Sequence, residues 1–290
     1  MVRNRRFGDR KDGRRLRTLA PYDTVSPYIM VSRDDAQNFL TDKFETSAVD
    51  RYVWQKRQEG LEGFGILHVL LAAYVRLVSQ KPRLNRFIAG QKIFARNTIE
   101  VNMAVKRKLA RDEINTIIKV RFEPMDTAAE VYQKFEAAFQ KAFAVTENDF
   151  DSTARIINYI PGLCKKFAVW LLKLLDYFGL LPLALLKVSP FHGSLFITSM
   201  GSLGIPPIFH HLYNFGNVPI FLAFGAKRHE NELGNQGEVL HRKYIDYTFV
   251  TDERICDGFY FASGLKMLRH ILASPAVLDT PPAEVCADIV

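Results

Sequence analysis

The segment Thr251–Gly258 has the sequence TDERICDG and lies between an apolar strand-like run and a run with helical spacing. Aspartate at such a turn, here Asp257, usually caps backbone donors or pairs with an arginine, and Gly258 permits a tight turn. By their chemistry alone, Asp257 and Gly258 are predicted to be structural.

A second candidate segment, Gly193–Gly204, is an apolar strand-like run that ends in hydroxyls and glycines, GSLFITSMGSLG. Thr198 and Ser199 would present hydroxyl donors at a turn, which is the kind of group that stabilises an oxyanion. Gly201 and Gly204 would allow a close approach of backbone or substrate. Composition alone favours the simpler alternative, an ordinary strand followed by a turn.

Several familiar sites are absent from the sequence. It contains no GxxxxGK[ST] phosphate loop, no GxSxG nucleophile elbow and no HExxH metal motif. Neighbouring residues point apart on a regular element, so His210 and His211 are poor joint ligands for one ion. The three cysteines form no CxxC pair, and we therefore expect no metal, no disulfide framework and a reducing cytoplasm.

The elements that must position these residues are a mixture of helices and strands. Helical spacing is predicted for 35–44, 48–58, 66–79, 127–143 and 259–273. Strands are predicted for 26–31, 86–89, 92–95, 98–105, 113–122, 195–200, 219–224 and 244–250. No repeat or linker divides the chain, so we expect one α/β or α+β domain over 21–278, with a loose tail over 279–290.

The first 18 residues are strongly basic. They hold eight lysines and arginines against two aspartates, a formal charge of +6 out of +8 for the chain. We predict a flexible, solvated arm over residues 1–20. An arm that binds phosphates of a nucleotide tail, nucleic acid or anionic lipid is the alternative. Phe7 is the one aromatic residue in the run, so base stacking, and with it nucleic-acid binding, is not expected.

An apolar segment, 167–186, approaches membrane character. Lys173 and Asp176 interrupt it, and Gly179 and Pro182 divide it, so it does not qualify as a membrane span. A buried or subunit-facing helix is the prediction. An interfacial helix at a membrane surface, or one wall of a pocket for an apolar substrate, is the alternative. No apolar stretch follows the N-terminal arginines, so no signal peptide is expected.

The order of these segments resembles the chloramphenicol acetyltransferase and dihydrolipoamide acyltransferase superfamily. Its HxxxDG motif reads ERICDG here, with Glu253 in the place of the histidine, and GSLFITSMG is similar to its hydroxyl-bearing strand. The stretches SPYIMVSRDDAQNF, GFGILHVLLAAYVRLVSQKPRLNRFI, FEPMDTAAEVYQKF and NVPIFLAFGA follow in the order of the family. The resemblance implies a two-layer fold with a mixed sheet packed against helices.

The family also implies a chemistry and an assembly. Its members are homotrimers whose active sites lie between subunits and use coenzyme A or lipoamide thioesters. By resemblance, Thr198 stabilises the tetrahedral oxyanion and Arg33 pairs with Asp257. The chain lacks the lipoyl and subunit-binding modules of the dehydrogenase-complex enzymes, so integration into such a complex is not expected.

Glu253 alters the expected mechanism. Carboxyl groups have a reference pKa of about 4.3 and thiols one of about 8.5, and a carboxylate repels a forming thiolate. Three hypotheses follow: an acyltransferase with Glu253 as its base, a non-catalytic trimer that binds coenzyme A or an acyl ligand as a sensor or scaffold, and a membrane-peripheral protein. His192, His210 and His211 are the candidates to replace the missing imidazole.

Overall fold

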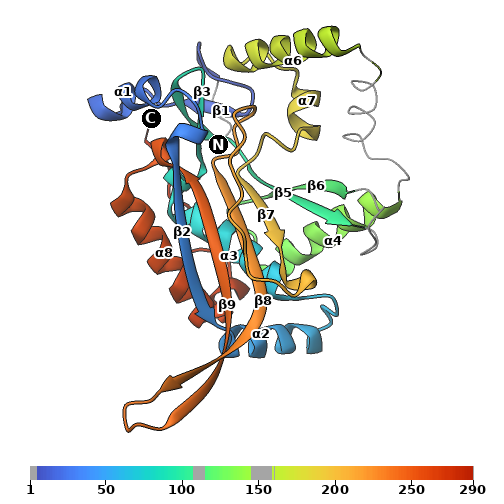
Figure 1. The fold of residues 1–290 in the computed structure, drawn as a ribbon, viewed down its shortest axis with the longest axis vertical. Helices are drawn as coiled ribbons and strands as arrows, with labels where there is room; N and C mark the ends of the chain where they lie inside the picture. The colour runs from blue at the N-terminus through green and yellow to red at the C-terminus, as the bar shows by residue number, and fades with distance from the viewer. Residues whose placement is uncertain (1–4, 107–114, 145–158, 160, 290) are drawn as a thin grey trace.

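The computed structural model describes residues 5–106, 115–144, 159 and 161–289. Its centre is a six-stranded mixed sheet in the order β2-β9-β8-β7-β5-β6, and a three-stranded sheet in the order β1-β4-β3 lies at one end of it (Figure 1). The pairs β5–β7 and β7–β8 are parallel, and the other neighbouring pairs of both sheets are antiparallel. The strand bounds are β1 Gly13–Arg15, β2 Gln37–Glu45, β3 Arg86–Ala89, β4 Lys92–Arg96, β5 Ile99–Lys106, β6 Asn115–Phe122, β7 Leu195–Ser199, β8 Ile220–Leu233 and β9 Val239–Asp252.

Helices α2, α3, α4 and α8 form one layer against a single face of the large sheet, and the main core fills the space between them. Helices α1, α6 and α7 lie at one end of the molecule (Figure 1). The core helix α3 is apolar nearly all round, as expected for a helix buried on most sides. The predicted two-layer α/β architecture is therefore confirmed. The helix bounds are α1 Pro21–Ile29, α2 Ser47–Gln58, α3 Ile66–Gln80, α4 Ala128–Ala144, α6 Gly162–Tyr177, α7 Leu183–Val188 and α8 Gly258–Ala273.

Most predicted elements are present with small shifts of their ends. Helix α3 ends at Gln80, two residues before Pro82, which opens a short 3-10 helix. Helix α4 begins with a capping box, because the Thr127 hydroxyl accepts from the Glu130 amide while the Glu130 carboxylate accepts from the Thr127 amide. Strands β8 and β9 are much longer than predicted and run out together as a hairpin beyond the body of the molecule (Figure 1).

Two predictions near the N-terminus are wrong. The strand predicted over 26–31 lies mostly in helix α1, which starts with Pro21 at its first position, where a missing N–H costs nothing. Pro27 cannot donate to the Asp23 carbonyl, and the Ser26 hydroxyl approaches that oxygen at 3.5 Å instead. The helix predicted over 35–44 is instead strand β2. Residues four apart, such as Leu40 and Phe44, share one face of a helix and of a strand alike, so the pattern could not separate them.

The basic arm and the C-terminal tail also differ from the prediction, since the described part of each is packed. Strand β1 pairs with β4, and Leu16 is buried in a small cluster with Ile88 and Ile93. At the other end, the Asp288 carboxylate accepts two hydrogen bonds from the Arg86 guanidinium, at 2.7 and 2.6 Å. Strand pairing and an apolar cluster thus hold the described part of the N-terminal segment, and a buried ion pair holds that of the C-terminal tail.

Candidate functional site

The TDERICDG segment forms a rigid turn at the end of β9. Glu253 starts a short 3-10 helix, 253–255, and Asp257 caps helix α8 by accepting from the Tyr260 amide at 2.8 Å. Glu253 is exposed, and its side chain makes no hydrogen bond or ion pair with any other described residue. The turn therefore presents one carboxylate outward on a fixed backbone.

The predicted ion pair between Arg33 and Asp257 is wrong. The Arg33 Nε atom lies 3.3 Å from the Asp252 Oδ2 atom, and both side chains are buried. Asp257 is exposed, and its nearest cation is Arg83 at 3.8 Å. Asp252 also accepts two hydrogen bonds from the Arg254 guanidinium, both at 2.8 Å, so one buried carboxylate holds two arginines.

The cluster of Arg33, Asp252 and Arg254 connects the motif to distant parts of the chain through hydrogen bonds. Besides Asp252, the Arg33 guanidinium donates to the carbonyls of Tyr213, Gly216 and Ile88. Burial lowers the pKa of Arg33, although the Asp252 charge opposes that shift. The arrangement is structural, because every donor is directed at protein oxygen atoms. The sequence signal for Asp252, an acid that directly ends an apolar strand, was not used in the prediction.

Thr198 and Ser199 end strand β7, half-buried, as the sequence suggested. Leu195 and Ile197 belong to the core on the helix side, whereas Phe196 packs on the opposite face of the sheet. By alternation, Thr198 faces that opposite side as well. Residues 205–218 cross this face, and the Thr248 hydroxyl donates to the Ile208 carbonyl at 3.0 Å. Thr198 therefore lies on the face that the helices leave uncovered.

The glycines near Thr198 serve two different purposes. Gly204 has φ of +70° in the turn after the short 3-10 helix 201–203, and a Cβ atom there would meet nothing. Gly225 is instead a packing requirement, because a Cβ atom there would lie 2.6 Å from the Pro207 ring. The close backbone approach expected of Gly201 and Gly204 is found at Gly201, where a Cβ atom would lie 3.2 Å from the Gly225 carbonyl oxygen, and is not found at Gly204.

Thr198 and Glu253 do not meet within one chain. Thr198 is the register partner of Ala223, which in turn pairs with Thr248. Asp252 ends β9 four residues further on, which is about 13 Å along the strand, and β9 lies two strand spacings, about 10 Å, from β7. A single reacting group cannot contact both side chains of one chain.

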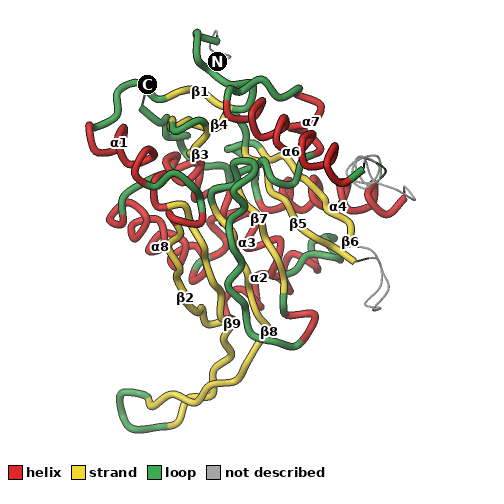
Figure 2. The backbone as a smooth tube through the Cα atoms, turned by 45° about the horizontal axis from the view of Figure 1, so that its top comes forward, coloured by secondary structure: helices red, strands yellow, loops and turns green. Residues whose placement is uncertain are grey.

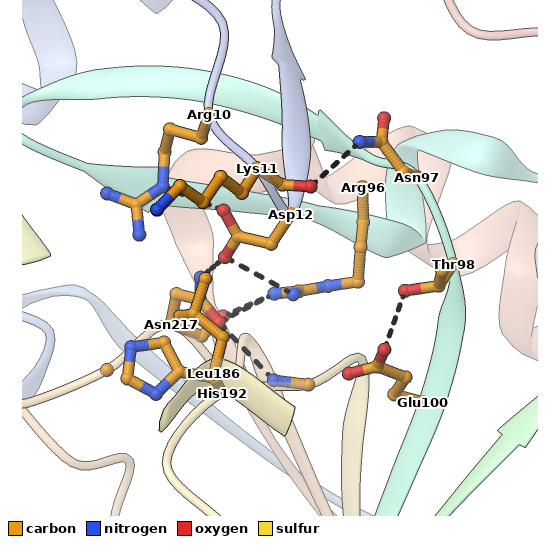
Figure 3. A network of polar contacts seen from close by, with 12 residues as sticks. Arg10, Lys11, Asp12, Arg96, Asn97, Thr98, Glu100, Leu186, His192 and Asn217 are labelled. Atoms are coloured by element: carbon orange, nitrogen blue, oxygen red, sulfur yellow. Dashed lines mark hydrogen bonds and ion pairs between the residues drawn. The ribbon is translucent and has the colours of Figure 1, made fainter. Parts of the chain in front are cut away.

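His192 is buried inside a polar network rather than placed beside a substrate space (Figure 3). Its Nδ1 atom lies 2.8 Å from the Ser189 hydroxyl, and its Nε2 atom lies 3.3 Å from the Asp176 carboxylate. Burial lowers the pKa of His192 despite that neighbouring charge. His192 therefore stays neutral in the interior and supports the fold.

The other two candidate histidines lie over the uncovered face of the sheet. The His210 ring stacks on Phe221 with a centroid distance of 4.2 Å, and its Nε2 atom is buried without a hydrogen-bond partner among the described residues. Burial and the neighbouring His211 lower the pKa of His210. Phe221 pairs with Phe196, two residues before Thr198, so His210 and Thr198 share this face. His211 is exposed and packs edge-on against Tyr213.

A buried network that the sequence analysis missed holds the N-terminal segment in place. Arg10 donates to Asp12 at 3.0 Å, and Asp12 also accepts from Asn217 (Figure 3). Arg10 donates to the Asp176 carboxylate as well, at 2.6 Å. Burial would raise the pKa of Asp176, yet His192 and Arg10 lower it to about 2. A lone acid inside an apolar helix is the sequence signal that could have revealed Asp176.

A cavity of about 280 Å³ opens beside the motif. It is bordered by Arg33 and Arg254, by the β3–β4 turn and by the end of helix α6. Ligand pockets usually measure about 300–1,000 Å³, so one chain supplies at most part of a site for a large cosubstrate. Among the described residues, no group of three or more histidine, cysteine, aspartate or glutamate side chains could hold a metal ion.

Comparison with known proteins identifies the fold. No protein family and no curated protein matches the sequence. Among solved structures, a probable dihydrolipoamide acetyltransferase from Listeria monocytogenes is 14% identical with a TM-score of 0.53, over 87% of this chain and 88% of that one. The dihydrolipoamide acetyltransferase of Azotobacter vinelandii is 16% identical with the same score, over 83% of each chain. A truncated catalytic core of the 2-oxoacid dehydrogenase complex from Thermoplasma acidophilum is 12% identical with a score of 0.50, over 90% of this chain and 99% of that one.

Proposed function

We propose that this chain, which has the fold of the dihydrolipoamide acyltransferase catalytic domain, is a coenzyme A-dependent acyltransferase with its site between subunits. Glu253 would act as the base and Thr198 as the oxyanion donor. The observation that carries the proposal is the placement of these two side chains. Thr198 lies at the end of β7, and Glu253 directly follows β9, with β8 between these two strands. The two side chains are therefore too far apart to act together within one copy.

The spacing of the motif supports the role of Glu253. In the Azotobacter vinelandii enzyme, the residues investigated in the catalytic mechanism are a serine, a histidine and an asparagine four positions after that histidine. Here Glu253 and Asp257 are also four positions apart, and a hydroxyl residue, Thr198, lies elsewhere in the sheet. The Glu253 carboxylate is exposed in one copy, and a second subunit would have to cover it to form an enclosed site.

The uncovered face of the sheet supports an assembly of several copies. It exposes a group of large apolar side chains that residues 203–213 and β2 contribute together. Phe39 and Phe209 lie edge-on at 5.4 Å and remain half-exposed. Such a contiguous apolar surface is typical of a subunit contact, and we propose a homotrimer. The side chains are Phe39, Leu203, Ile205, Ile208, Phe209 and Tyr213.

The chemical step would follow the order of general base catalysis. Glu253 takes the proton from the thiol of coenzyme A or from an acceptor group, and that atom attacks the carbonyl carbon of the acyl group. Negative charge develops on the carbonyl oxygen, where the Thr198 hydroxyl donates a hydrogen bond. The intermediate then expels the leaving group, which recovers the proton from Glu253. Arg254 lines the adjacent cavity, where the cosubstrate would lie.

Release of free thiol from acetyl-coenzyme A, measured with a panel of amine, hydroxyl and thiol acceptors, tests the activity. We expect Glu253→Gln and Thr198→Val each to abolish release, while Asp257→Asn retains it. Thiol release that Glu253→Gln leaves unchanged would remove Glu253 from the mechanism.

Mixing the two inactive variants tests the location of the site. In a cyclic trimer, each site takes Thr198 from one copy and Glu253 from its neighbour. Random mixing of equal amounts of Glu253→Gln and Thr198→Val subunits would restore about a quarter of the sites. Mass spectrometry verifies that mixed trimers have formed. If they show no recovery of thiol release, Thr198 and Glu253 do not share a site.

A second candidate is a non-catalytic trimer that binds an acyl or coenzyme A ligand as a sensor or scaffold. The observation that favours it is the carboxylate at position 253, since a negative charge repels a forming thiolate. Calorimetry with coenzyme A and acetyl-coenzyme A, together with the thiol-release assay, distinguishes the scaffold from the acyltransferase. Binding without thiol release supports the scaffold, and failure to bind either ligand excludes it.

His210 is the alternative base that the fold makes available. It shares the sheet face of Thr198, and its Nε2 atom has no partner among the described residues. If His210→Gln abolishes thiol release while Glu253→Gln preserves it, the imidazole takes the role assigned here to Glu253. His211→Gln is the matched control from the same segment.

A further inference from the structure

Helix α6 is attached to the protein by polar contacts and exposes its apolar side. Asp176 is its one buried residue, held by Arg10, and Tyr177 donates to the Gln91 side chain at 2.5 Å. Six large apolar residues of the helix remain about 40–85% exposed. Of the two alternatives in the prediction, a buried helix or a subunit-facing one, the buried helix is therefore wrong. These residues are Leu163, Phe167, Trp170, Leu171, Leu174 and Tyr177.

The exposed residues form one continuous stripe. Leu163, Phe167, Trp170 and Leu174 recur at intervals of three and four, which places them on one side of the helix. Lys166 and Lys173 follow the same spacing along one border of the stripe. Beyond the helix, Phe178 and Leu180 extend the apolar surface and are each 62% exposed.

Helix α1 extends this surface at the same end of the molecule. Both helices lie across the long axis of the sheet, and the described N-terminal segment runs between them (Figures 1 and 2). Tyr22 and Ile29 on α1 are 72% and 71% exposed. We call the surface formed by residues 5–29 and 161–190 the end face.

The end face carries nearly all of the net charge of the protein. Its residues include eleven lysines and arginines against four aspartates, a formal +7, where the whole chain has +8. Three of the four aspartates are already paired with arginine: Asp9 with Arg17, and Asp12 and Asp176 with Arg10. The end face therefore combines exposed apolar side chains with a positive charge.

We propose that the end face binds the surface of an anionic phospholipid bilayer. A helix with an apolar stripe bordered by lysines, and with a tryptophan in the stripe, lies in the interface between headgroups and acyl chains. Helix α6 has 16 residues, about 24 Å, which is too short to cross the roughly 30 Å hydrocarbon core. None of the described helices is long and apolar enough to span a membrane.

The positive charge of the end face favours binding to anionic lipid over association with another copy of the chain. Two copies meeting through this surface would bring two faces of formal charge +7 together, which opposes association. Anionic headgroups instead attract each lysine or arginine near the membrane surface.

Fluorescence of the full chain gives a direct test, because the protein has two tryptophans at opposite ends. Trp170 lies on α6 and Trp54 lies on α2, where it is 66% exposed. With Trp54→Phe, we expect vesicles of phosphatidylcholine and phosphatidylserine to shift the emission of Trp170 to shorter wavelength. Trp170→Phe leaves only Trp54, whose emission should not shift.

Sedimentation with the same vesicles measures the affinity for the bilayer. Separate variants then distinguish the apolar contribution to that affinity from the electrostatic one. Phe167→Glu should weaken binding about tenfold or more, because a phenylalanine no longer enters the acyl region. Lys166→Glu with Lys173→Glu should weaken it about fivefold for each lysine, and added salt should weaken binding of the unmodified protein. The matched controls are Leu233→Glu on the distant hairpin, 79% exposed, and the pair Lys243→Glu with Lys266→Glu, which should bind as the unmodified protein does.

Three results would overturn the proposal. The first is equal sedimentation with phosphatidylcholine alone and with the anionic mixture. The second is equal loss of binding in Phe167→Glu and Leu233→Glu. The third is a Trp170 shift that follows protein concentration without vesicles, which would assign the end face to a contact between copies. Thiol release is independent of all three, so this proposal and the acyltransferase proposal can fail separately.

Discussion

Asp252 accepts hydrogen bonds from Arg33 at 3.3 Å and from Arg254 at 2.8 Å, while Asp257 in the same motif is exposed. The carboxylate that holds the turn is therefore the last residue of β9 and precedes Glu253 directly. The two aspartates have different structural roles: one neutralises buried arginines, and the other caps a helix.

The first prediction compares these two aspartates. Asp252→Ala should lower the free energy of unfolding by about 3–5 kcal/mol, because it leaves two buried guanidinium groups without a counter-charge. Asp257→Ala should cost about 1 kcal/mol, the usual loss for a helix N-cap. Urea unfolding followed by circular dichroism measures both values. Equal losses in the two variants would contradict the assignment of the buried role to Asp252.

The second prediction concerns the base. Glu253→His places an imidazole at the exposed position and removes the carboxylate that repels a thiolate. Thiol release from acetyl-coenzyme A should rise about 10²–10⁴-fold over Glu253→Gln, the usual contribution of a general base. Arg254 and Asp252 stay unchanged, so both variants should melt alike. A Glu253→His protein as slow as Glu253→Gln would indicate that this position no longer faces a reacting group.

The third prediction concerns the pH dependence of stability through His68. Burial lowers the pKa of His68 to about 4, and its Nδ1 atom accepts a hydrogen bond from the Gly65 amide at the start of α3. The neutral form is favoured in the folded state, so its stabilising effect is complete above the unfolded pKa of about 6.5. It is lost as pH falls toward about 4.

Between about pH 7 and pH 5, His68 should therefore account for a loss of about 2 kcal/mol. The His68→Gln protein, which keeps an acceptor without a proton to gain, should lose less stability over this range. His270→Gln on the exposed side of α8 is the control and should follow the unmodified protein. The nearby Glu136 lies 3.5 Å from Nε2 and would reduce the loss, so Glu136→Gln should steepen the dependence.

The fourth prediction concerns the anchor of the N-terminal segment. Asp176→Asn should cost about 2–3 kcal/mol, because the buried Arg10 guanidinium keeps only Asp12 as a charged partner. In the unmodified protein, the pKa of about 2 means that this stabilisation is present above about pH 4 and is lost as pH falls toward 2. At neutral pH, trypsin should cleave the Asp176→Asn protein within residues 10–17 faster than it cleaves the unmodified protein. Asp9→Asn, whose partner Arg17 is partly exposed, is the control.

Local periodicity predicted the elements that are buried or regularly half-buried. Helix α3 is apolar on nearly every side, and β5 alternates apolar and polar residues, so each was identified from the sequence within two residues of its bounds. Strand β2 and helix α1 were not. Leu40 and Phe44 fit either period, and the pairing of β2 with β9 over nine residues decided in favour of a strand.

The sequence by itself determined the motif, the order of segments and thus the two-layer fold, because backbone patterns and turn residues act over short distances. Only the tertiary structure decided which charges meet. The partners Arg33 and Asp252 are separated by 219 residues, and Arg10 and Asp176 by 166, and neither spacing leaves a pattern in the sequence. The structure likewise decided that the apolar side of α6 faces outward. A buried ion pair at Asp176 fixes the helix from its polar side, and hydropathy alone does not show which side the protein covers.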